Sequence, residues 1–207
     1  MLDKDIVLVG YSGHGYVVAE ALISSESELK YYSELEEQKR NPFNLKYLGF
    51  EKNLDFQGWN DNFSFVLGIG DNKLRFEVFN LIKSKGLEIK NVIHKTASIS
   101  STAKVGIGNF ISKNVSINPM AEIQDCCIIN TGAIIEHECV IKTGAHIAPG
   151  AVLAGSVSIG ENCFIGANSV IKEGVVIGAN VIVGAGAVVL KNIEEGKKVV
   201  GNPLREI

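Results

Sequence analysis

The sequence predicts two joined units of different fold class, a small α/β unit over residues 1–90 and an all-β parallel solenoid over residues 91–207. Three observations support this division: a six-residue repeat in the second part, two glycine-rich turns in the first, and aromatic residues that nearly all precede residue 111. With 207 residues, of which 46% are hydrophobic, the chain is long and apolar enough for a real core.

The six-residue repeat defines the second unit. An aliphatic side chain stands at every sixth position, namely Ile93, Ile99, Val105, Ile111, Ile117, Ile123, Ile129, Ile135, Ile141, Ile147, Leu153, Ile159, Ile165, Ile171, Ile177, Val183 and Val189. If about a third of such a segment is aliphatic, chance produces this series with odds on the order of one in 10⁸. The pattern therefore indicates a structural repeat.

A second position in each repeat predicts the shape of the solenoid. The residue four places after each aliphatic one is small or compact except at Asn109: Ala97, Ala103, Val115, Ala121, Cys127, Ala133, Cys139, Ala145, Ala151, Val157, Cys163, Ser169, Val175, Val181 and Ala187. This alternation is typical of a narrow triangular solenoid with three hexapeptides per coil, and it predicts about five coils. Glycines are expected to give the corners their backbone freedom: Gly106, Gly132, Gly144, Gly150, Gly160, Gly166, Gly178 and Gly184.

Composition and charge exclude several classes of function. The formal net charge of -3 provides no basic field to hold a nucleic acid or an anionic membrane surface. No apolar run approaches the roughly 20 residues of a membrane span, and no signal-peptide run follows Lys4, so we expect a cytoplasmic protein. Three of the four cysteines, Cys127, Cys139 and Cys163, fall in the small inward position, which predicts free thiols that pack as small hydrophobes.

The first unit begins with an apolar run from Ile6 to Val9, which the turn Gly10 to Gly15 and a helix predicted over residues 16–23 follow. A strand, a glycine-rich turn and a helix in this order point backbone N–H groups at an anion, usually a phosphate. A tight turn without a ligand is the alternative, because the glycine spacing departs from the dinucleotide-binding pattern.

A second unit of the same kind follows, with a strand over Phe63 to Leu67, a turn over Gly68 to Asn72 and a helix over Leu74 to Lys83. Turns at the ends of two parallel strands predict one shared crevice, as in Rossmann-like domains. Residues 24–62 show no clear second strand ending in Asp, which argues against a standard NAD site and against hydride transfer. We interpret the acidic run from Glu34 to Glu37 as a solvated surface.

Two histidines of the solenoid, His137 and His146, lie outside the inward positions. His137 is near a corner, and the flanking carboxylates of Glu136 and Glu138 can fix its tautomer and raise its basicity. An amine that attacks a thioester must lose a proton, and a neutral imidazole can accept it. A plain surface histidine is the alternative that the residues alone leave open.

The chain resembles, along its whole length, bacterial sugar O- and N-acetyltransferases related to sialic acid acetyltransferase (NeuD-like) and to the UDP-4-amino-sugar acetyltransferase of bacillosamine synthesis (PglD-like). The resemblance rests on four segments: Gly10 to Gly15, Gly68 to Arg75, Asn130 to Gly150 and Val199 to Pro203. It implies a left-handed parallel β-helix, acetyl-CoA as co-substrate, no metal, and a homotrimer with its active sites between adjacent solenoids. The small domain is implied to hold a nucleotide-linked amino sugar, with UDP as the expected nucleotide.

The resemblance also implies roles for single residues. His137 matches the catalytic base, and Glu138 matches the carboxylate that raises its basicity. The residues implied at acetyl-CoA are His146, Gly155, Ala167 and Ala185. The residues implied at the nucleotide sugar are Ser12, Gly13, His14, Ser33, Glu34 and Gly70. Related proteins commonly carry paired aspartates where this chain has Ser33 and Glu34.

Our first hypothesis is an acetyl-CoA-dependent N-acetyltransferase that modifies the 4-amino group of a nucleotide-linked 4-amino-4,6-dideoxy sugar by direct attack on the thioester. O-acetylation of sialic acid or another sugar is the alternative within the same class. A metal hydrolase or carbonic-anhydrase-like protein would have to use His94, His137 and His146, without the close histidine pair of such sites. A purely structural solenoid is the third alternative, and the phosphate-type turns argue against it.

Overall fold

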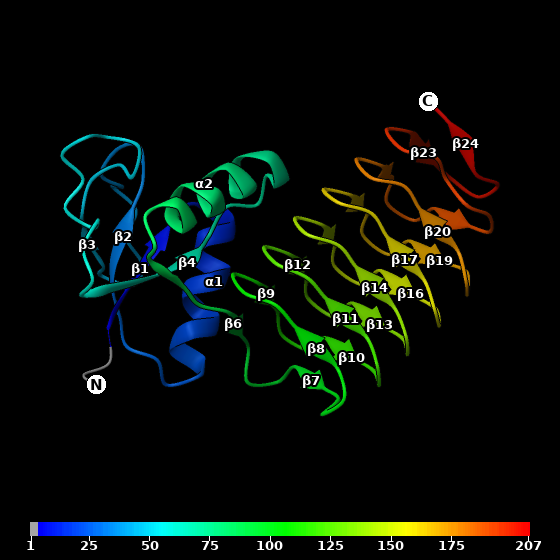
Figure 1. Ribbon diagram of the computed structural model, residues 1–207, viewed down its shortest axis with the longest axis horizontal. Coiled ribbons are helices and arrows are strands. Elements are labelled where there is room, and N and C mark those ends of the chain that lie inside the picture. Colours follow the sequence, from blue (N-terminus) through cyan, green and yellow to red (C-terminus); the bar gives the residue numbers. More distant parts are fainter. Residues whose placement is uncertain (1–3) are drawn as a thin grey trace.

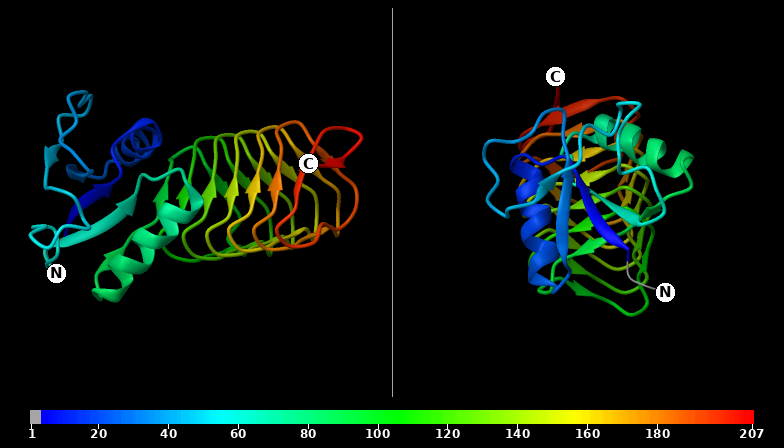
Figure 2. Two further views of the ribbon diagram at one scale, coloured as in Figure 1. Left: turned by 90° about the horizontal axis from the view of Figure 1, so that it is seen from above. Right: turned by 90° about the vertical axis from the view of Figure 1, so that its left-hand side faces the viewer.

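The computed structural model describes residues 4–207 and contains the two predicted units (Figure 1). The α/β unit sits at one end of an elongated solenoid, and the C-terminus lies at the opposite end (Figure 2). Within residues 4–207, no helix is long and apolar enough to cross a membrane.

The α/β unit is built on five parallel strands in the order β3-β2-β1-β4-β5. Its elements are β1 (Asp5–Val9), α1 (Gly13–Ser24), β2 (Leu29–Ser33), β3 (Lys46–Tyr47), β4 (Phe63–Leu67), α2 (Asn72–Ser84) and β5 (Glu88–Ile89). Alternate residues of β1 face opposite sides of the sheet, so that Ile6 and Leu8 share a core with α1, whereas Val7 and Val9 share one with α2. The two helices therefore cover opposite faces of the central strand.

Both helices begin earlier than predicted, although the predicted strands at residues 6–9 and 63–67 are confirmed. Helix α1 begins at Gly13, so the end of the glycine-rich turn is already helical. Helix α2 begins at Asn72, because the Asp71 carboxylate accepts a hydrogen bond from the N–H of Leu74 (2.8 Å) and caps the helix.

Residues 24–62 contain a strand, β2, that the sequence pattern did not locate and that, as expected, does not end in Asp. It pairs in parallel with β1, with Leu8 opposite Tyr32 and Val9 opposite Ser33. The strand ends at Ser33, and the acidic residue that follows is Glu34 rather than an aspartate within the strand. Packing against β1 and β3 stabilises this polar, tyrosine-rich segment as a strand, which its own sequence pattern signals weakly.

The solenoid consists mainly of two-residue strands that pair in parallel with the strand one coil further along the chain. The first face contains β6 (Val92–Ile93), β9 (Phe110–Ile111), β12 (Ile128–Ile129), β15 (His146–Ile147), β18 (Phe164–Ile165), β21 (Ile182–Val183), β23 (Lys198–Val200) and β24 (Arg205–Glu206). The second contains β7 (Ser98–Ile99), β10 (Ser116–Ile117), β13 (Ile134–Ile135), β16 (Val152–Leu153), β19 (Val170–Ile171) and β22 (Val188–Val189). The third contains β8 (Lys104–Val105), β11 (Glu122–Ile123), β14 (Val140–Ile141), β17 (Ser158–Ile159) and β20 (Val176–Ile177). The solenoid ends with β24, which pairs antiparallel with β23.

The inward register predicted from the sequence is confirmed. From Ile111 to Val189 every sixth residue is buried in one continuous core. Ile93, in the first coil, is 39% exposed because no coil packs beneath it. All four cysteines are free and buried, as expected for the three in the small inward position.

The corners use backbone geometry that the glycine count only partly predicts. A positive φ recurs every six residues, at Gly108, Asn114, Met120, Cys126, Gly132, Glu138, Gly144, Gly150, Ser156, Asn162, Asn168, Gly174, Asn180 and Gly186. Five of the predicted corner glycines do not have a positive φ, namely Gly106, Gly184, Gly160, Gly166 and Gly178. The last three lie against the backbone of the next coil. They are glycines because a Cβ would lie 2.5 Å from a backbone nitrogen of the next coil.

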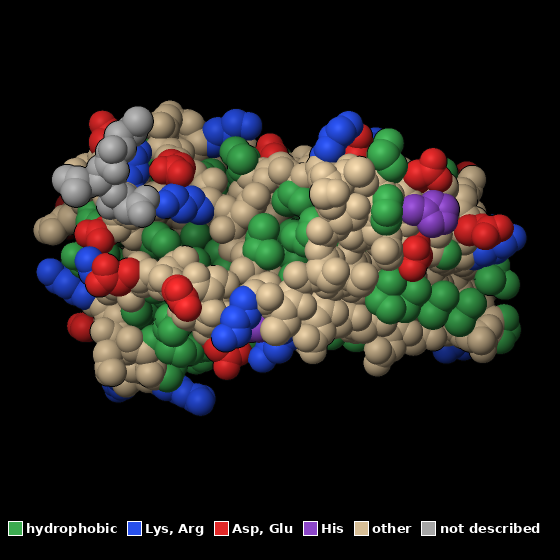
Figure 3. Space-filling view, turned by 90° about the horizontal axis from the view of Figure 1, so that it is seen from below, with side chains coloured by type: hydrophobic (Ala, Val, Ile, Leu, Met, Phe, Trp, Pro, Cys, Tyr) green, Lys and Arg blue, Asp and Glu red, His purple; other side chains and the backbone are tan. Residues whose placement is uncertain are grey.

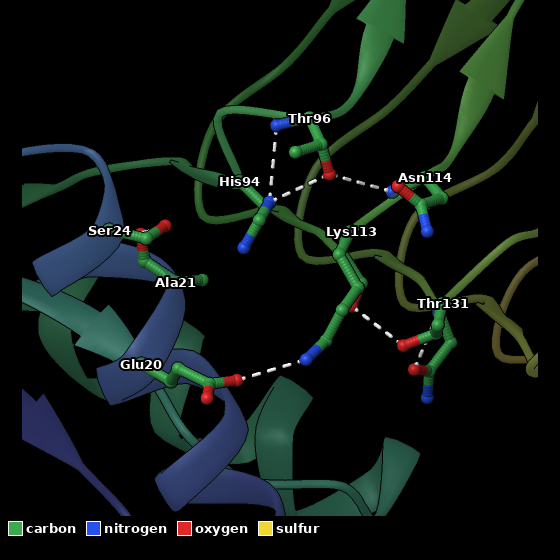
Figure 4. Close-up of polar contacts among 10 residues, drawn as sticks. Glu20, Ala21, Ser24, His94, Thr96, Lys113, Asn114 and Thr131 are labelled. Carbon is green, nitrogen blue, oxygen red and sulfur yellow. Dashed lines mark hydrogen bonds and ion pairs between the residues drawn. The ribbon is translucent and has the colours of Figure 1, made fainter.

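Helix α1 packs against the first coils of the first face. Val92, Phe110 and Ile128 share a core cluster with the residues of α1. At the rim of this contact, Lys113 forms an ion pair with Glu20 of α1 at 3.1 Å (Figure 4). The solenoid is therefore one wall of any cavity that opens between the two units.

Candidate active site

The two glycine-rich turns touch each other at the carboxyl ends of β1 and β4. The N–H of Gly68 donates to the carbonyl of Val9 at 2.7 Å. A Cβ on Gly15 or on Gly68 would collide with the carbonyl oxygen of Gly10, so only glycine permits this approach. The predicted shared crevice is therefore present in the structure.

A cavity of about 390 Å³ occupies this crevice, and we call it the turn cavity. Its lining is Gly10, Ser12, Glu34, Leu35, Phe50, Glu51, Gly68, Ile69, Gly70, Asp71 and Leu74. Ser12 and Gly13 are exposed at the N-terminus of α1, where backbone N–H groups have no partners within the helix. An anionic group can bind there through the helix dipole and these donors.

The acidic residue after β2 lies in this cavity and is held by backbone donors. The Glu34 carboxylate accepts hydrogen bonds from the N–H of Tyr11 (2.9 Å) and of Leu35 (3.0 Å). Interpreting Glu34 as part of a solvated run is thus wrong, although Glu36 and Glu37 are exposed as expected. Ser33, in contrast, is buried and does not line the cavity, because its hydroxyl donates to Glu51 at 2.6 Å.

A second and larger cavity, of about 670 Å³, lies between α2 and the solenoid, and we call it the junction cavity. Its lining is Gly70, Asp71, Asn72, Lys73, Phe76, Glu77, Asn162, Phe164, Asn180 and Ile182. Both cavities include Gly70 and Asp71, so they meet at this turn. Sequence reasoning missed this cavity, and one available signal was Phe164, the only aromatic residue after Phe110.

His146 and His14 meet beside the junction cavity. His146, on β15, is 8% exposed, with its ring 4.9 Å from that of Phe164 and 6.4 Å from that of His14. Burial and the nearby charge of Arg75 lower the pKa of His146 to about 3 and that of His14 to about 4. Both imidazoles are therefore neutral at neutral pH. His14 faces the solenoid rather than the turn cavity where it was expected.

His137 occupies an exposed corner between the second and third faces. Its Nδ1 lies 3.1 Å from Oε2 of Glu138, and Ser156 donates a further hydrogen bond to the same oxygen at 3.3 Å. When Nδ1–H donates to Glu138, Nε2 remains free to accept a proton. Gly155, one coil further on, lies under the imidazole, since a Cβ there would be 2.6 Å from the ring.

The predicted residues therefore form separate groups within one chain. The junction cavity lies beside the first face and the turn cavity is lined by the α/β unit, whereas His137 and Gly155 occupy the corner between the second and third faces. Ala167 and Ala185 follow β18 and β21 at the corner between the first and second faces. No single chain brings the candidate base to the two cavities.

The histidines of the metal-site alternative are also dispersed. His94 lies next to β6, where its Nδ1 contacts Thr96 at 3.0 Å (Figure 4). Across residues 4–207, no three side chains of His, Cys, Asp or Glu gather as metal ligands.

Comparison with known proteins agrees with this architecture. Residues 5–82 match the family model described as the PglD N-terminal domain, and residues 156–191 match that of the hexapeptide repeat of succinyl-transferase. The acetyltransferase domain of PglB from Neisseria gonorrhoeae, solved with acetyl coenzyme A, is 27% identical with a TM-score of 0.93 over 99% of this chain and 100% of that one. WeeI from Acinetobacter baumannii, 24% identical, shares the fold with a TM-score of 0.87 over 99% of this chain and 100% of that one.

These matches define the class of the protein: it is a hexapeptide-repeat acetyltransferase, and its solenoid is a left-handed parallel β-helix. A point mutant of the perosamine N-acetyltransferase from Caulobacter crescentus, solved with CoA and GDP-perosamine, is 31% identical with a TM-score of 0.91. That match covers 99% of this chain and 97% of the relative. The chain therefore belongs to the family of this sugar N-acetyltransferase.

Proposed function

We propose that this protein transfers an acetyl group from acetyl-CoA to the amino group of a nucleotide-linked 4-amino-4,6-dideoxy sugar. The observation that carries the proposal is the meeting of two cavities at Gly70 and Asp71, one built by the two glycine-rich turns and the other lying between α2 and the solenoid. An amino sugar bound in the turn cavity can thus reach the acetyl group of acetyl-CoA bound in the junction cavity.

The turn cavity fits a nucleoside diphosphate. The diphosphate would bind at Ser12 and Gly13, where the N-terminus of α1 provides N–H donors. Glu34, fixed at the end of β2, would accept hydrogen bonds from the ribose hydroxyls. The sugar would then extend past Gly70 toward the junction cavity. UDP and GDP both satisfy this arrangement, and the Caulobacter relative binds GDP-perosamine.

The acetyl-CoA arm would enter the junction cavity beside Phe164 and His146. Ala167 and Ala185 share one solenoid corner, where their small side chains leave room for a narrow pantetheine chain. Gly155, which lies under the candidate base at a different corner, would come with that base. The four free thiols fit a reducing compartment, and we place the reaction in the cytoplasm.

The base would come from a second chain, and we propose a homotrimer for this reason. The second face exposes an apolar row, with Ile134 36% and Val170 41% exposed, that a neighbouring solenoid can cover. Figure 3 shows such hydrophobic patches on the solenoid surface. Closed packing of three solenoids would bring His137 of the partner subunit to the cavities of the first chain.

In the proposed reaction, His137 and Glu138 manage the transferred proton. The amine nitrogen attacks the thioester carbonyl carbon, and Nε2 of His137 accepts the proton that the nitrogen loses as the C–N bond forms. Glu138 stabilises the resulting imidazolium through Nδ1. The C–S bond then breaks, and the CoA thiolate receives the proton from the imidazolium.

The experiment is a thiol-release assay with purified protein and acetyl-CoA. We expect release with a UDP-, GDP- or dTDP-linked 4-amino-4,6-dideoxy sugar, with mass spectrometry showing one added acetyl group. Thiol release with sialic acid alone would favour O-acetylation. Absence of release with every acceptor would reject the proposal.

A further inference from the structure

Arg75, in the first turn of α2, is buried between the two units. It is only 1% exposed, and among residues 4–207 no carboxylate forms an ion pair with it. A buried charge without such a partner is costly unless its donors are satisfied by hydrogen bonds. The contacts of this guanidinium therefore indicate what it does.

The guanidinium joins the turn of the α/β unit to the solenoid. Its Nε donates to the carbonyl of Cys126 at 3.0 Å, and Nη2 donates to the carbonyl of Gly144 at 2.8 Å. Its Nη1 donates to the carbonyl of Gly70 at 3.2 Å, and Nη2 also donates to the side-chain oxygen of Asn72 at 3.0 Å. One planar, rigid group thus fixes two coils and the Gly68–Asp71 turn together.

Asn72 continues this connection by one coil. Its side-chain nitrogen donates to the carbonyls of Asn162 (3.1 Å) and Cys163 (3.0 Å). The accepting carbonyls of Cys126, Gly144 and Asn162 occupy the same corner of three consecutive coils, because 18 residues separate each from the next. The start of α2 is therefore attached along the solenoid over three coils.

This attachment lies where the two cavities meet, since Gly70 and Asp71 line both of them and Asn72 lines the junction cavity. We propose that Arg75 is a positioning residue for acetyl transfer. It fixes the Gly68–Asp71 turn against the solenoid and so sets the distance and orientation between the acceptor amine and the acetyl thioester. The inference rests on the proposed function. Arg75 touches neither substrate in this assignment and acts through the turn.

Two substitutions separate positioning from simple stabilisation. Arg75→Lys keeps a positive charge but cannot reproduce the planar set of donors, and Arg75→Met removes the charge and the donors. Ile82→Ala is the matched control, because Ile82 is a fully buried core residue of the same helix that lines neither cavity. Arg40→Lys, at an exposed arginine of the same unit, controls for the chemical change itself.

Kinetics are compared at a temperature where all variants are folded, with melting temperature and molar mass measured on the same samples. We expect both Arg75 variants to lower kcat/KM by roughly 10- to 100-fold, since a small displacement of bound reactants is costly. Ile82→Ala should lower the melting temperature by as much as the Arg75 variants do, while its kcat/KM stays within about twofold of wild type. If the Arg75 variants lose only melting temperature, as this control does, the positioning role is wrong.

Hydrogen exchange gives a readout that does not depend on activity. Amides of residues 68–74 should exchange faster in Arg75→Lys and Arg75→Met than in Ile82→Ala, while amides of the third face stay protected. Unchanged exchange in this segment would overturn the attachment, and with it the inference. If wild type transfers no acetyl group while the segment loses protection in the variants, the proposed function fails and the attachment remains.

Discussion

His14 and His146 are buried together as neutral imidazoles, and this makes the junction of the two units sensitive to acid. The pKa of each is lowered below 6.5, so the folded protein stays neutral at both positions while the unfolded chain takes up protons as pH falls below 6.5. Their contribution to stability is complete above that pH. Between pH 7 and pH 5 we expect a loss of about 2 kcal/mol for each histidine.

The check is the melting temperature of wild type and of His14→Asn and His146→Asn at pH 7 and pH 5. Asparagine cannot take up a proton in this range, so each variant should lose less melting temperature between the two pH values than wild type. An equal loss in all three proteins would mean that other groups produce the acid sensitivity.

The exposed position of His137 allows its chemical role to be tested without disturbing the fold. Its side chain is 58% exposed and contacts Glu138 and Gly155. We expect His137→Ala to lower kcat by roughly 10² to 10⁴, as loss of a general base does, with a melting temperature within a few degrees of wild type. His94→Ala is the control at a second partly exposed histidine. Near-normal turnover in His137→Ala would remove this residue from the mechanism.

At the scale of a single strand, stability depends on the inward register. Ile141 on β14 is fully buried among aliphatic neighbours, and the adjacent Lys142 is exposed. Ile141→Asp puts an unpaired carboxylate into this core, and we expect it to prevent folding or to lower the melting temperature by well over 10 °C. Lys142→Ser should stay within about 2 °C of wild type. Circular dichroism melts check both, and a stable Ile141→Asp protein would contradict the register.

The elements of this protein differ in how far local sequence predicts them. The solenoid is predictable because each coil repeats the same burial requirement, so that positions such as Ile141 and Cys139 follow from counting in sixes. Strand β2 is not, because β1 and β3 stabilise it from both sides. At the candidate site, the motif around His137 is local and predictable. The junction cavity depends on a contact between Asn72 and Asn162, which are 90 residues apart, and no local sequence pattern predicts that contact.

At the scale of the whole molecule, the separation of His137 from the cavities is the strongest reason to expect assembly. One chain contributes the turn cavity in its α/β unit and the junction cavity beside its first face, and its base lies at a different corner. We expect light scattering to give a homotrimer of about 67 kDa, from the 22.3 kDa chain. An active monomer at assay concentration would contradict the shared site.

Mixed assembly tests the shared site more directly. Gly13→Asp should abolish acceptor binding without disturbing the fold, because a side chain there meets no neighbour and its carboxylate would repel the diphosphate. Neither Gly13→Asp nor His137→Ala should be active alone. Unfolded together and refolded as a mixture, equal amounts should place an intact cavity beside an intact His137 of the partner subunit at about a quarter of the sites. Activity that returns in the mixture, and in neither variant refolded alone, requires a site built from two chains. If the cavity and the base of each site belonged to one chain, mixing the variants would restore no activity.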